Sequence, residues 1–132
     1  MMVPTDQCWK VILLLMSVLT ITACQSGGIT NNAGTVEGKV IEVEGGYGNL
    51  DTDITESLVI GAALGKGDKF LFSCKGKSFE VTFATTYSDV PRGDWVGFVN
   101  WAGNLRIARS FANAAETSGC GVNDLVRISA IP

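Results

Sequence analysis

Short apolar runs separated by glycine-containing turns constrain the fold of this chain more than any other feature. From residue 35 onward the runs last only a few residues, and turns such as Gly45–Asn49 and Gly65–Asp68 interrupt them. Short runs with branched residues at alternate positions are typical of β-strands. The apolar or alternating runs lie at 35–44, 58–64, 70–74, 79–84, 94–101, 105–108 and 125–131. A helix is expected only at 113–118, before Gly119, so the pattern predicts a β-sandwich or β-barrel.

The first 23 residues have the features of a targeting segment. Lys10 precedes an uncharged run at 11–23, which is too short to cross a hydrocarbon core of about 30 Å as a helix. Such a run suits the apolar region of a secretory signal. It ends in Ile21–Cys24 (ITAC), which resembles the lipobox of bacterial lipoprotein signals. The resemblance implies a signal peptide at 1–23, cleavage before Cys24 and acylation of that cysteine. A plain signal peptide with an incidental cysteine is the alternative.

Export would place the rest of the chain in the cell envelope, lipid-anchored to a membrane. Residues 24–34 are small, polar and glycine-rich, which predicts a flexible tether, and 35–132 are enough for one domain. An oxidising compartment permits Cys74 and Cys120 to form a disulfide. Two buried thiols that never meet are the alternative.

Composition argues against several classes of function. The chain contains no histidine, which removes Ser-His-Asp and Cys-His catalysis and the commonest metal ligand. No cysteine pair has the spacing of a zinc site, and no glycine-rich loop leads into a helix as a phosphate cradle does. A net charge of −3 provides no basic surface for nucleic acid. We therefore expect no metal site, no nucleic-acid partner and no catalysis by this chain alone.

Three stretches of the chain share their order and spacing with a known family. They are 43–54 (VEGGYGNLDTDI), 86–94 (TYSDVPRGD) and 100–108 (NWAGNLRIA), the last followed by Asn113-Ala-Ala and a closing GVNDLV. Together they resemble the C-terminal barrel domain of the S-adenosyl-L-methionine hydroxide adenosyltransferase and fluorinase family. The resemblance implies an adenosyltransferase C-terminal-like barrel over 35–132. The predicted fold class is all-β, a small antiparallel β-barrel with at most one short helix.

The resemblance also implies a ligand side for this barrel. In the family, a larger N-terminal α/β domain supplies the catalytic aspartate, and the cofactor lies between that domain and the barrel of a neighbouring subunit in a trimer. The residues carried to the ligand side are Glu44, Tyr47, Asn49, Asn100 and Arg109. Glu44 would accept a hydrogen bond from the methionine ammonium, and Tyr47 would stack on a purine. The alternatives are a solvated strand end, an aromatic cap on the barrel, a turn asparagine and an exposed strand charge.

Four positions depart from the family pattern. Glu44, Tyr47, Asp53 and Trp101 stand where the family has Asp, Phe, Asn and Ser. The Trp101 ring is the largest change, because it would fill space near the adenine edge or its loop.

The resulting hypothesis is a lipid-anchored binding module rather than an enzyme, attached to the membrane through Cys24. It has no resident cofactor and takes S-adenosyl-L-methionine or an adenosine-like ligand at a barrel end built by the turns 45–49 and 100–103. One alternative is an interaction or structural lipoprotein with an envelope protein as partner. Another is the non-catalytic half of a split S-adenosylmethionine hydrolase.

Overall fold

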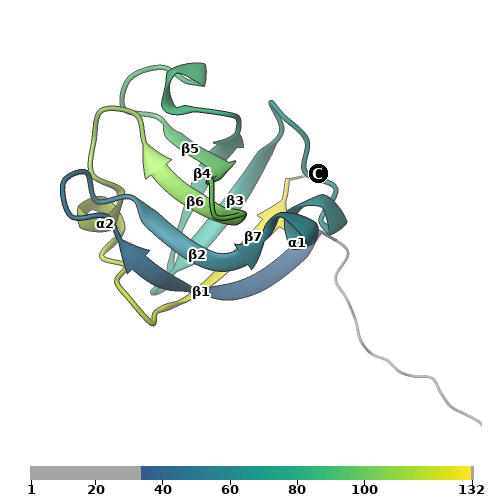
Figure 1. Cartoon of the computed structure of the whole chain (residues 1–132), viewed down its shortest axis with the longest axis horizontal. Helices are drawn as coiled ribbons and strands as arrows, with labels where there is room; N and C mark the ends of the chain where they lie inside the picture. The colour runs from purple at the N-terminus through teal and green to yellow at the C-terminus, as the bar shows by residue number, and fades with distance from the viewer. Residues whose placement is uncertain (1–33, 132) are drawn as a thin grey trace, which may run out of the picture. The chain divides into compact units, whose positions relative to one another are not determined.

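Seven strands close into a barrel in the computed structural model, which describes residues 34–131 (Figure 1). The predicted signal segment, Cys24 and nearly all of the tether lie outside these residues. The strand order around the barrel is β1-β2-β6-β5-β4-β3-β7. The strands are β1 Thr35–Val43, β2 Leu50–Thr55, β3 Lys69–Cys74, β4 Lys77–Phe83, β5 Trp95–Val99, β6 Asn104–Arg109 and β7 Leu125–Ala130. Between them lie α1 Glu56–Gly61, the short 3-10 helix η3 Tyr87–Asp89 and α2 Ala114–Ser118.

The predicted fold class, a small all-β barrel, is confirmed, and two details differ from expectation. Residues 34–131 contain two short α-helices instead of at most one, because the apolar run at 58–64, which resembles a strand in sequence, lies partly in α1. Thr55 caps this helix by accepting a hydrogen bond from the Leu58 backbone N–H at 3.4 Å, and Val59 turns inward. The pairing of β4 with β5 is parallel rather than antiparallel. The long connection at 84–94, which packs against β5 and β6, allows these two consecutive strands to run parallel.

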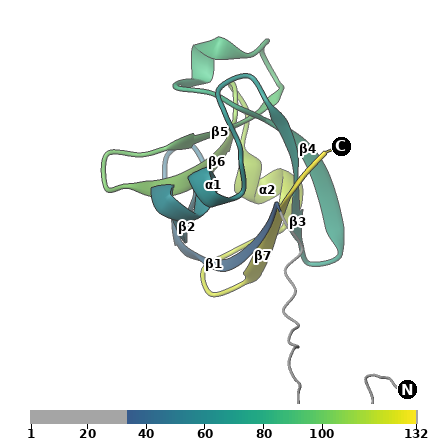
Figure 2. The ribbon, with the colours of Figure 1, turned by 90° about the vertical axis from the view of Figure 1, so that its right-hand side faces the viewer.

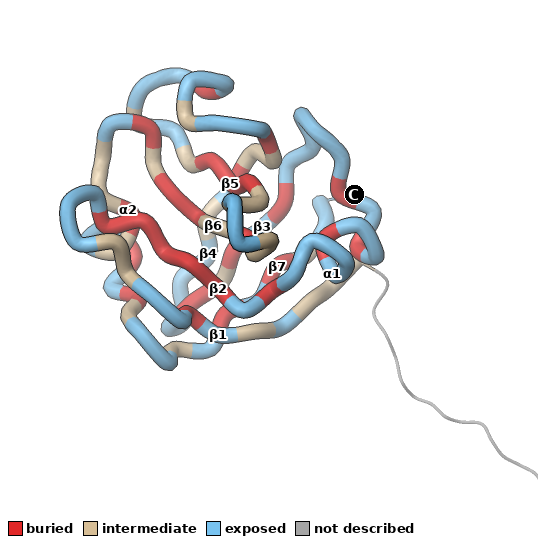
Figure 3. The backbone as a smooth tube through the Cα atoms, viewed as in Figure 1, coloured by how far each residue is buried: buried red, intermediate tan, exposed pale blue. Residues whose placement is uncertain are grey.

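The core fills the barrel with large side chains from every strand. Those without solvent exposure include Val40, Leu50, Ile54, Phe70, Phe72, Val81, Leu105, Ile107 and Ile128, and the partly buried Trp95 of β5 packs against them. Figure 3 shows buried positions along β2 and β6 and exposed positions at the turn between β1 and β2. A second, smaller cluster lies where the 84–94 connection meets β5 and β6; its members are Ala84, Val90, Val96, Phe98 and Ala108, with Tyr87 packed against it. The connection is therefore packed on the barrel rather than projecting from it.

Strand register defines two opposite ends of the barrel. β2 and β6 are antiparallel, with Leu50 opposite Ile107 and Thr55 opposite Asn104. The turn at 44–49 consequently lies beside the end of β6 and beside α2, as Figure 1 shows, and we call this the α2 end. The turn at 100–103 lies beside the start of β6 and beside α1, which crosses the barrel mouth that faces the viewer in Figure 2. We call this the α1 end.

The two cysteines of the domain meet at the α2 end. Cys74, the last residue of β3, is bonded to Cys120, which follows α2, across 46 residues of sequence. The disulfide joins the barrel wall to the segment between α2 and β7. Among residues 34–131, no helix has the length and apolar character needed to cross a membrane.

Candidate functional site

A pocket of about 780 Å³ opens at the α2 end. It lies where the turn at 44–49, the η3 helix and the segment after β6 meet. Its lining residues are Glu44, Gly46, Tyr47, Asn49, Tyr87, Arg109, Phe111, Ala112 and Asn113. Four of the five ligand-side residues expected from the sequence are therefore together: Glu44, Tyr47, Asn49 and Arg109.

The turn at 44–49 is held in place by its close packing on α2. Gly48 has a φ of 69°, and a Cβ at this position would lie 1.9 Å from Asn113 Oδ1. The Gly48 carbonyl accepts a hydrogen bond from Ala115 N at 2.9 Å, while Asn113 Oδ1 caps the helix through Glu116 N at 2.8 Å. Only glycine allows this approach, so the residue determines where one wall of the pocket lies.

Asn49 is a buried member of a polar network rather than an exposed turn residue. Its side-chain Nδ2 donates to Glu44 Oε1 at 2.6 Å and to the Tyr87 hydroxyl at 2.9 Å. The residue is only 2% exposed. Because buried polar groups are stabilised by such partners, these bonds fix the turn residues Glu44 and Asn49 relative to Tyr87, which is distant in sequence.

Arg106 joins this network from the middle of β6, and the sequence analysis did not identify it. Its Nε donates to Asp51 Oδ1 at 2.6 Å and its Nη2 donates to Asp51 Oδ2 at 2.8 Å. Its Nη1 lies 3.2 Å from both Glu44 Oε1 and the Tyr87 hydroxyl. The hydrogen bonds to Asp51 raise the pKa of Arg106, although burial opposes the shift. Arg106 therefore stays charged and orients two pocket side chains from behind.

The sequence shows the position of Arg106, but its role cannot be inferred until the register between β2 and β6 is known. Arg106 stands between Leu105 and Ile107, both of which point into the core, so alternation alone places it outside. Its partner Asp51 lies directly opposite on β2, and that pairing is known only once the two strands are aligned.

Arg109 lines the pocket but uses its guanidinium for structural contacts. Its Nε and Nη2 donate to the Gly93 carbonyl at 3.0 and 2.7 Å, and its Nη1 donates to Thr117 Oγ1 at 3.1 Å. The guanidinium carbon also lies 5.8 Å from the centre of the Trp95 ring. Arg109 thereby joins the 84–94 connection to α2.

Two exposed aromatic rings border the pocket. Tyr47 is 70% exposed and Phe111 is 74% exposed, and they come from different segments of the lining. Phe111 has a φ of 57°, a left-handed conformation that costs a residue with a Cβ roughly 1–2 kcal/mol. The Arg92 guanidinium carbon lies 4.1 Å from the centre of its ring. The sequence resemblance identified Tyr47 but not Phe111.

Asn100 does not line this pocket. Its Oδ1 accepts hydrogen bonds from Ala102 N at 3.0 Å and Asn104 N at 3.1 Å, so it stabilises the tight turn between β5 and β6. Its Nδ2 donates to Asp51 Oδ1 at 3.1 Å. The expectation that the turns 45–49 and 100–103 build one barrel end is wrong, because the antiparallel β2–β6 pairing puts them at opposite ends.

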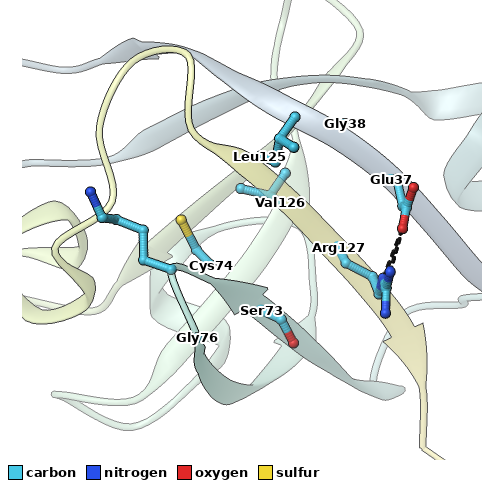
Figure 4. A pocket seen from close by; sticks show the side chains of 9 residues that line it. Glu37, Gly38, Ser73, Cys74, Gly76, Leu125, Val126 and Arg127 are labelled. Atoms are coloured by element: carbon cyan, nitrogen blue, oxygen red, sulfur yellow. Dashed lines mark hydrogen bonds and ion pairs between the residues drawn. The ribbon is translucent and has the colours of Figure 1, made fainter.

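A second, smaller hollow of about 260 Å³ lies on the wall formed by β1, β3 and β7. Figure 4 shows its lining, in which Arg127 Nε donates to Glu37 Oε2 at 3.0 Å. Cys74, one of its lining residues, is already bonded to Cys120. This hollow contains none of the predicted ligand residues, so the pocket at the α2 end is the stronger candidate.

The chemistry of the α2-end pocket suits binding better than proton transfer. Aromatic walls with a few oriented amide, hydroxyl and carboxylate groups are typical of small-molecule sites. Glu44 is engaged by Asn49 and Arg106, and Asp51 forms a two-point ion pair with Arg106. Both carboxylates therefore serve to orient neighbouring side chains around the pocket.

Comparisons with known proteins show the family and the fold of this chain. The profile of the SAM hydroxide adenosyltransferase C-terminal domain matches residues 38–127. The fold is similar to an uncharacterized conserved protein from Thermotoga maritima, with a TM-score of 0.71, 22% identity, and coverage of 85% of this chain and 42% of that one. A conserved hypothetical protein from Thermus thermophilus has a TM-score of 0.49 and 25% identity, over 70% of this chain and 34% of that one.

This chain thus spans less than half the length of either solved structure. No protein of curated function matches it. Since the profile covers more than half of the sequence, the chain belongs to the SAM hydroxide adenosyltransferase C-terminal domain family.

Proposed function

We propose that the domain binds S-adenosyl-L-methionine or a related adenosine-like ligand in the α2-end pocket, as a lipid-anchored module of the cell envelope. The observation that carries this proposal is the convergence of Glu44, Tyr47, Asn49 and Arg109 on one pocket. The family resemblance points to these residues independently of their positions in the structure. Aromatic rings and a few polar groups around a hollow of about 780 Å³ are the usual composition of a small-molecule site.

The lining supports a ligand with a flat ring and polar substituents. Tyr47 and Phe111 provide exposed aromatic faces on which a purine can stack, a contact worth roughly 1–3 kcal/mol per base. Glu44 uses Oε1 for its contacts with Asn49 and Arg106, which leaves Oε2 as an acceptor for an ammonium or hydroxyl of the ligand. The nearby positive charge of Arg106 weakens the attraction of Glu44 for a cation. We therefore expect the adenosine part to contribute more to affinity than the methionine part.

We further propose that this chain binds the ligand without turning it over. No histidine is present, and both carboxylates nearest the pocket interact with Arg106. We expect no adenosine or methionine to be released when purified protein is incubated with S-adenosyl-L-methionine. Steady release that copurifies with the protein and stops in Glu44→Gln would contradict this.

The lipid anchor is supported by the apolar run and the ITAC sequence that ends at Cys24. Cells grown with a labelled fatty acid should label the parent protein but not Cys24→Ala. If the variant remains labelled and fractionates with membranes like the parent, the anchor is wrong.

A protein partner is the second candidate, and the exposed Tyr47 and Phe111 rings favour it because aromatic residues are enriched in interface cores. This partner would cover the same α2 end. The alternative of a split hydrolase has no separate support from the geometry.

Calorimetric titration of residues 25–132 with adenosine, S-adenosyl-L-methionine and methionine tests the binding proposal. We expect heat from the first two ligands and much less from methionine. Tyr47→Ala should weaken binding about tenfold or more through loss of stacking. Trp101→Ala removes another exposed aromatic ring, this one from the α1 end, and should leave affinity unchanged. Absence of binding at millimolar ligand would favour the protein partner.

A further inference from the structure

We propose that the α1 end is a membrane-docking surface that rests in the headgroup region of the bilayer to which the chain is anchored. The inference builds on the anchor at Cys24 from the proposed function. It adds an orientation, in which the α1 end faces the lipid and the α2-end pocket faces away from it.

The first observation is where the chain enters the domain. The Gly34 carbonyl accepts a hydrogen bond from Ala130 N at 3.0 Å, and a Cβ on Gly34 would lie 3.9 Å from the Ala62 carbonyl oxygen. Gly34 is therefore fixed beside the segment that ends α1. The chain from Cys24 to Gly34 spans at most about 36 Å when fully extended, at roughly 3.6 Å per residue. An acylated Cys24 would therefore keep Gly34, and the α1 end with it, within about 36 Å of the membrane surface.

The second observation is that large apolar side chains are exposed at this end. Trp101 is 96% exposed in the β5–β6 turn, and Ile60 is 66% exposed on α1. Leu58 is also exposed on α1, while Val59 between them is buried in the core. The Gly103 carbonyl accepts a hydrogen bond from Glu56 N at 3.0 Å, which ties the turn to the start of the helix. Figure 2 shows α1 across this end of the barrel with the β5–β6 hairpin beside it.

Lipid is the occupant that this combination fits best. Tryptophan favours the membrane–water interface, where its ring is partly buried and its N–H stays hydrated. Insertion of isolated apolar residues is too weak to recruit a protein, but a tether raises the effective concentration of the surface near the membrane. The exposed charges on α1 and around the start of β3 are balanced in sign, Glu56 and Asp68 against Lys66 and Lys69, so apolar contact rather than attraction to anionic lipid should dominate.

The test uses the processed, acylated full chain in phosphatidylcholine vesicles with bromine atoms on the lipid chains, which quench tryptophan emission on contact. We expect quenching in the parent and loss of most of it in Trp101→Phe, because Trp95 is half-buried in the barrel. The double variant Leu58→Ser with Ile60→Ser should reduce the quenching severalfold. The matched control is Val122→Ser with Leu125→Ser, which removes two exposed apolar residues from the α2 end and should change nothing. Raising the salt concentration should have little effect.

The outcomes separate the anchor from the docking surface. If the chain carries the acyl label and floats with the vesicles but is not quenched, the docking surface is wrong and the anchor stands. If quenching persists in Trp101→Phe, or is lost equally in the α2-end control, the assigned face is wrong. If no acyl label is present, the anchor is wrong and the docking surface with it. Ligand titration remains an independent measurement.

Discussion

The two ends of the barrel are closed in different ways. At the α1 end, a short helix lies across the mouth and inserts Val59 into the core, so apolar packing seals the barrel. At the α2 end, the side chains of Asn49, Glu44 and Arg106 form a polar network behind an open pocket. Polar side chains at the α1 end, such as Asn100 and Thr55, bond the backbone of the turn and the helix start, whereas buried charge at the α2 end holds pocket residues in fixed orientations.

This difference gives the exposed aromatic residues of the two ends different meanings. Tyr47 and Phe111 lie beside oriented polar groups, as expected for recognition of a particular ligand. Trp101 is exposed in a turn that is bonded to the start of α1, a helix with exposed aliphatic residues, as expected for contact with a surface that has no fixed shape. The exposed fraction of a ring does not distinguish a ligand-binding residue from a surface-contact residue. The presence or absence of oriented polar groups beside the ring does.

The largest effect should come from removing the disulfide, which lies at the α2 end. Replacing Cys74 and Cys120 with alanine should lower the free energy of unfolding by roughly 2–5 kcal/mol, because a long loop in the unfolded chain is no longer closed. Ile60→Ala at the α1 end should change it by about 0.5 kcal/mol or less. Denaturant titration measures both. Protein purified from the envelope should yield a linked peptide pair without reduction, and two freely alkylated thiols would contradict the pairing.

The second effect concerns the Arg106–Asp51 pair. Arg106→Met should lower the free energy of unfolding by roughly 2–4 kcal/mol, because Asp51 would remain buried without its positively charged partner. The matched control is Arg127→Met, which breaks the exposed ion pair with Glu37 and should cost about 1 kcal/mol or less. The side chains of the first pair are 17% and 7% exposed, compared with 58% and 65% in the second. Equal losses in denaturant titration would show that the network does not stabilise the α2 end.

The smallest effect is a pH dependence of stability that arises from Asp89 in the 84–94 connection. The backbone N–H groups of Thr85 and Thr86 donate to Asp89 Oδ2 at 3.0 and 3.2 Å and lower the pKa of that carboxyl below its usual range. A lowered folded-state pKa stabilises the protein above the unfolded value of about 3.9, and the stabilisation is lost as pH falls through the folded value. Below about pH 4, Asp89→Asn should therefore lose less stability than the parent on acidification. Carboxyl chemical shifts measure the titration directly, and a midpoint at or above the usual value would refute the assignment.

Local patterns were sufficient to predict much of the barrel. The helix expected at 113–118 is confirmed, with Asn113 as its N-cap and Gly119 in the left-handed conformation at its end. The expected strands near 35–44, 70–74 and 105–108 are also present, because alternation and turn residues act over a few positions.

Features that depend on long-range pairing could not be predicted. β2, with the sequence LDTDIT, has too few apolar residues to stand out, and its buried Asp51 is explained only by Arg106 across the sheet. The apolar run that forms α1 is ambiguous between strand and helix until its capping residue and the barrel mouth are known. The expected position of Asn100 beside the turn at 45–49 was wrong because the sequence of a turn does not say at which end of the barrel the turn lies.

The central claim is that the α2 end binds an adenosine-like ligand and the α1 end does not. Titrating labelled protein with adenosine while recording amide chemical shifts tests it most directly. The account predicts saturable shifts for Gly46, Asn49 and Ala112, which line the pocket, and none for Ala102 or Gly103 in the β5–β6 turn. Shifts confined to that turn, or none at any of these amides at millimolar adenosine, would contradict the account.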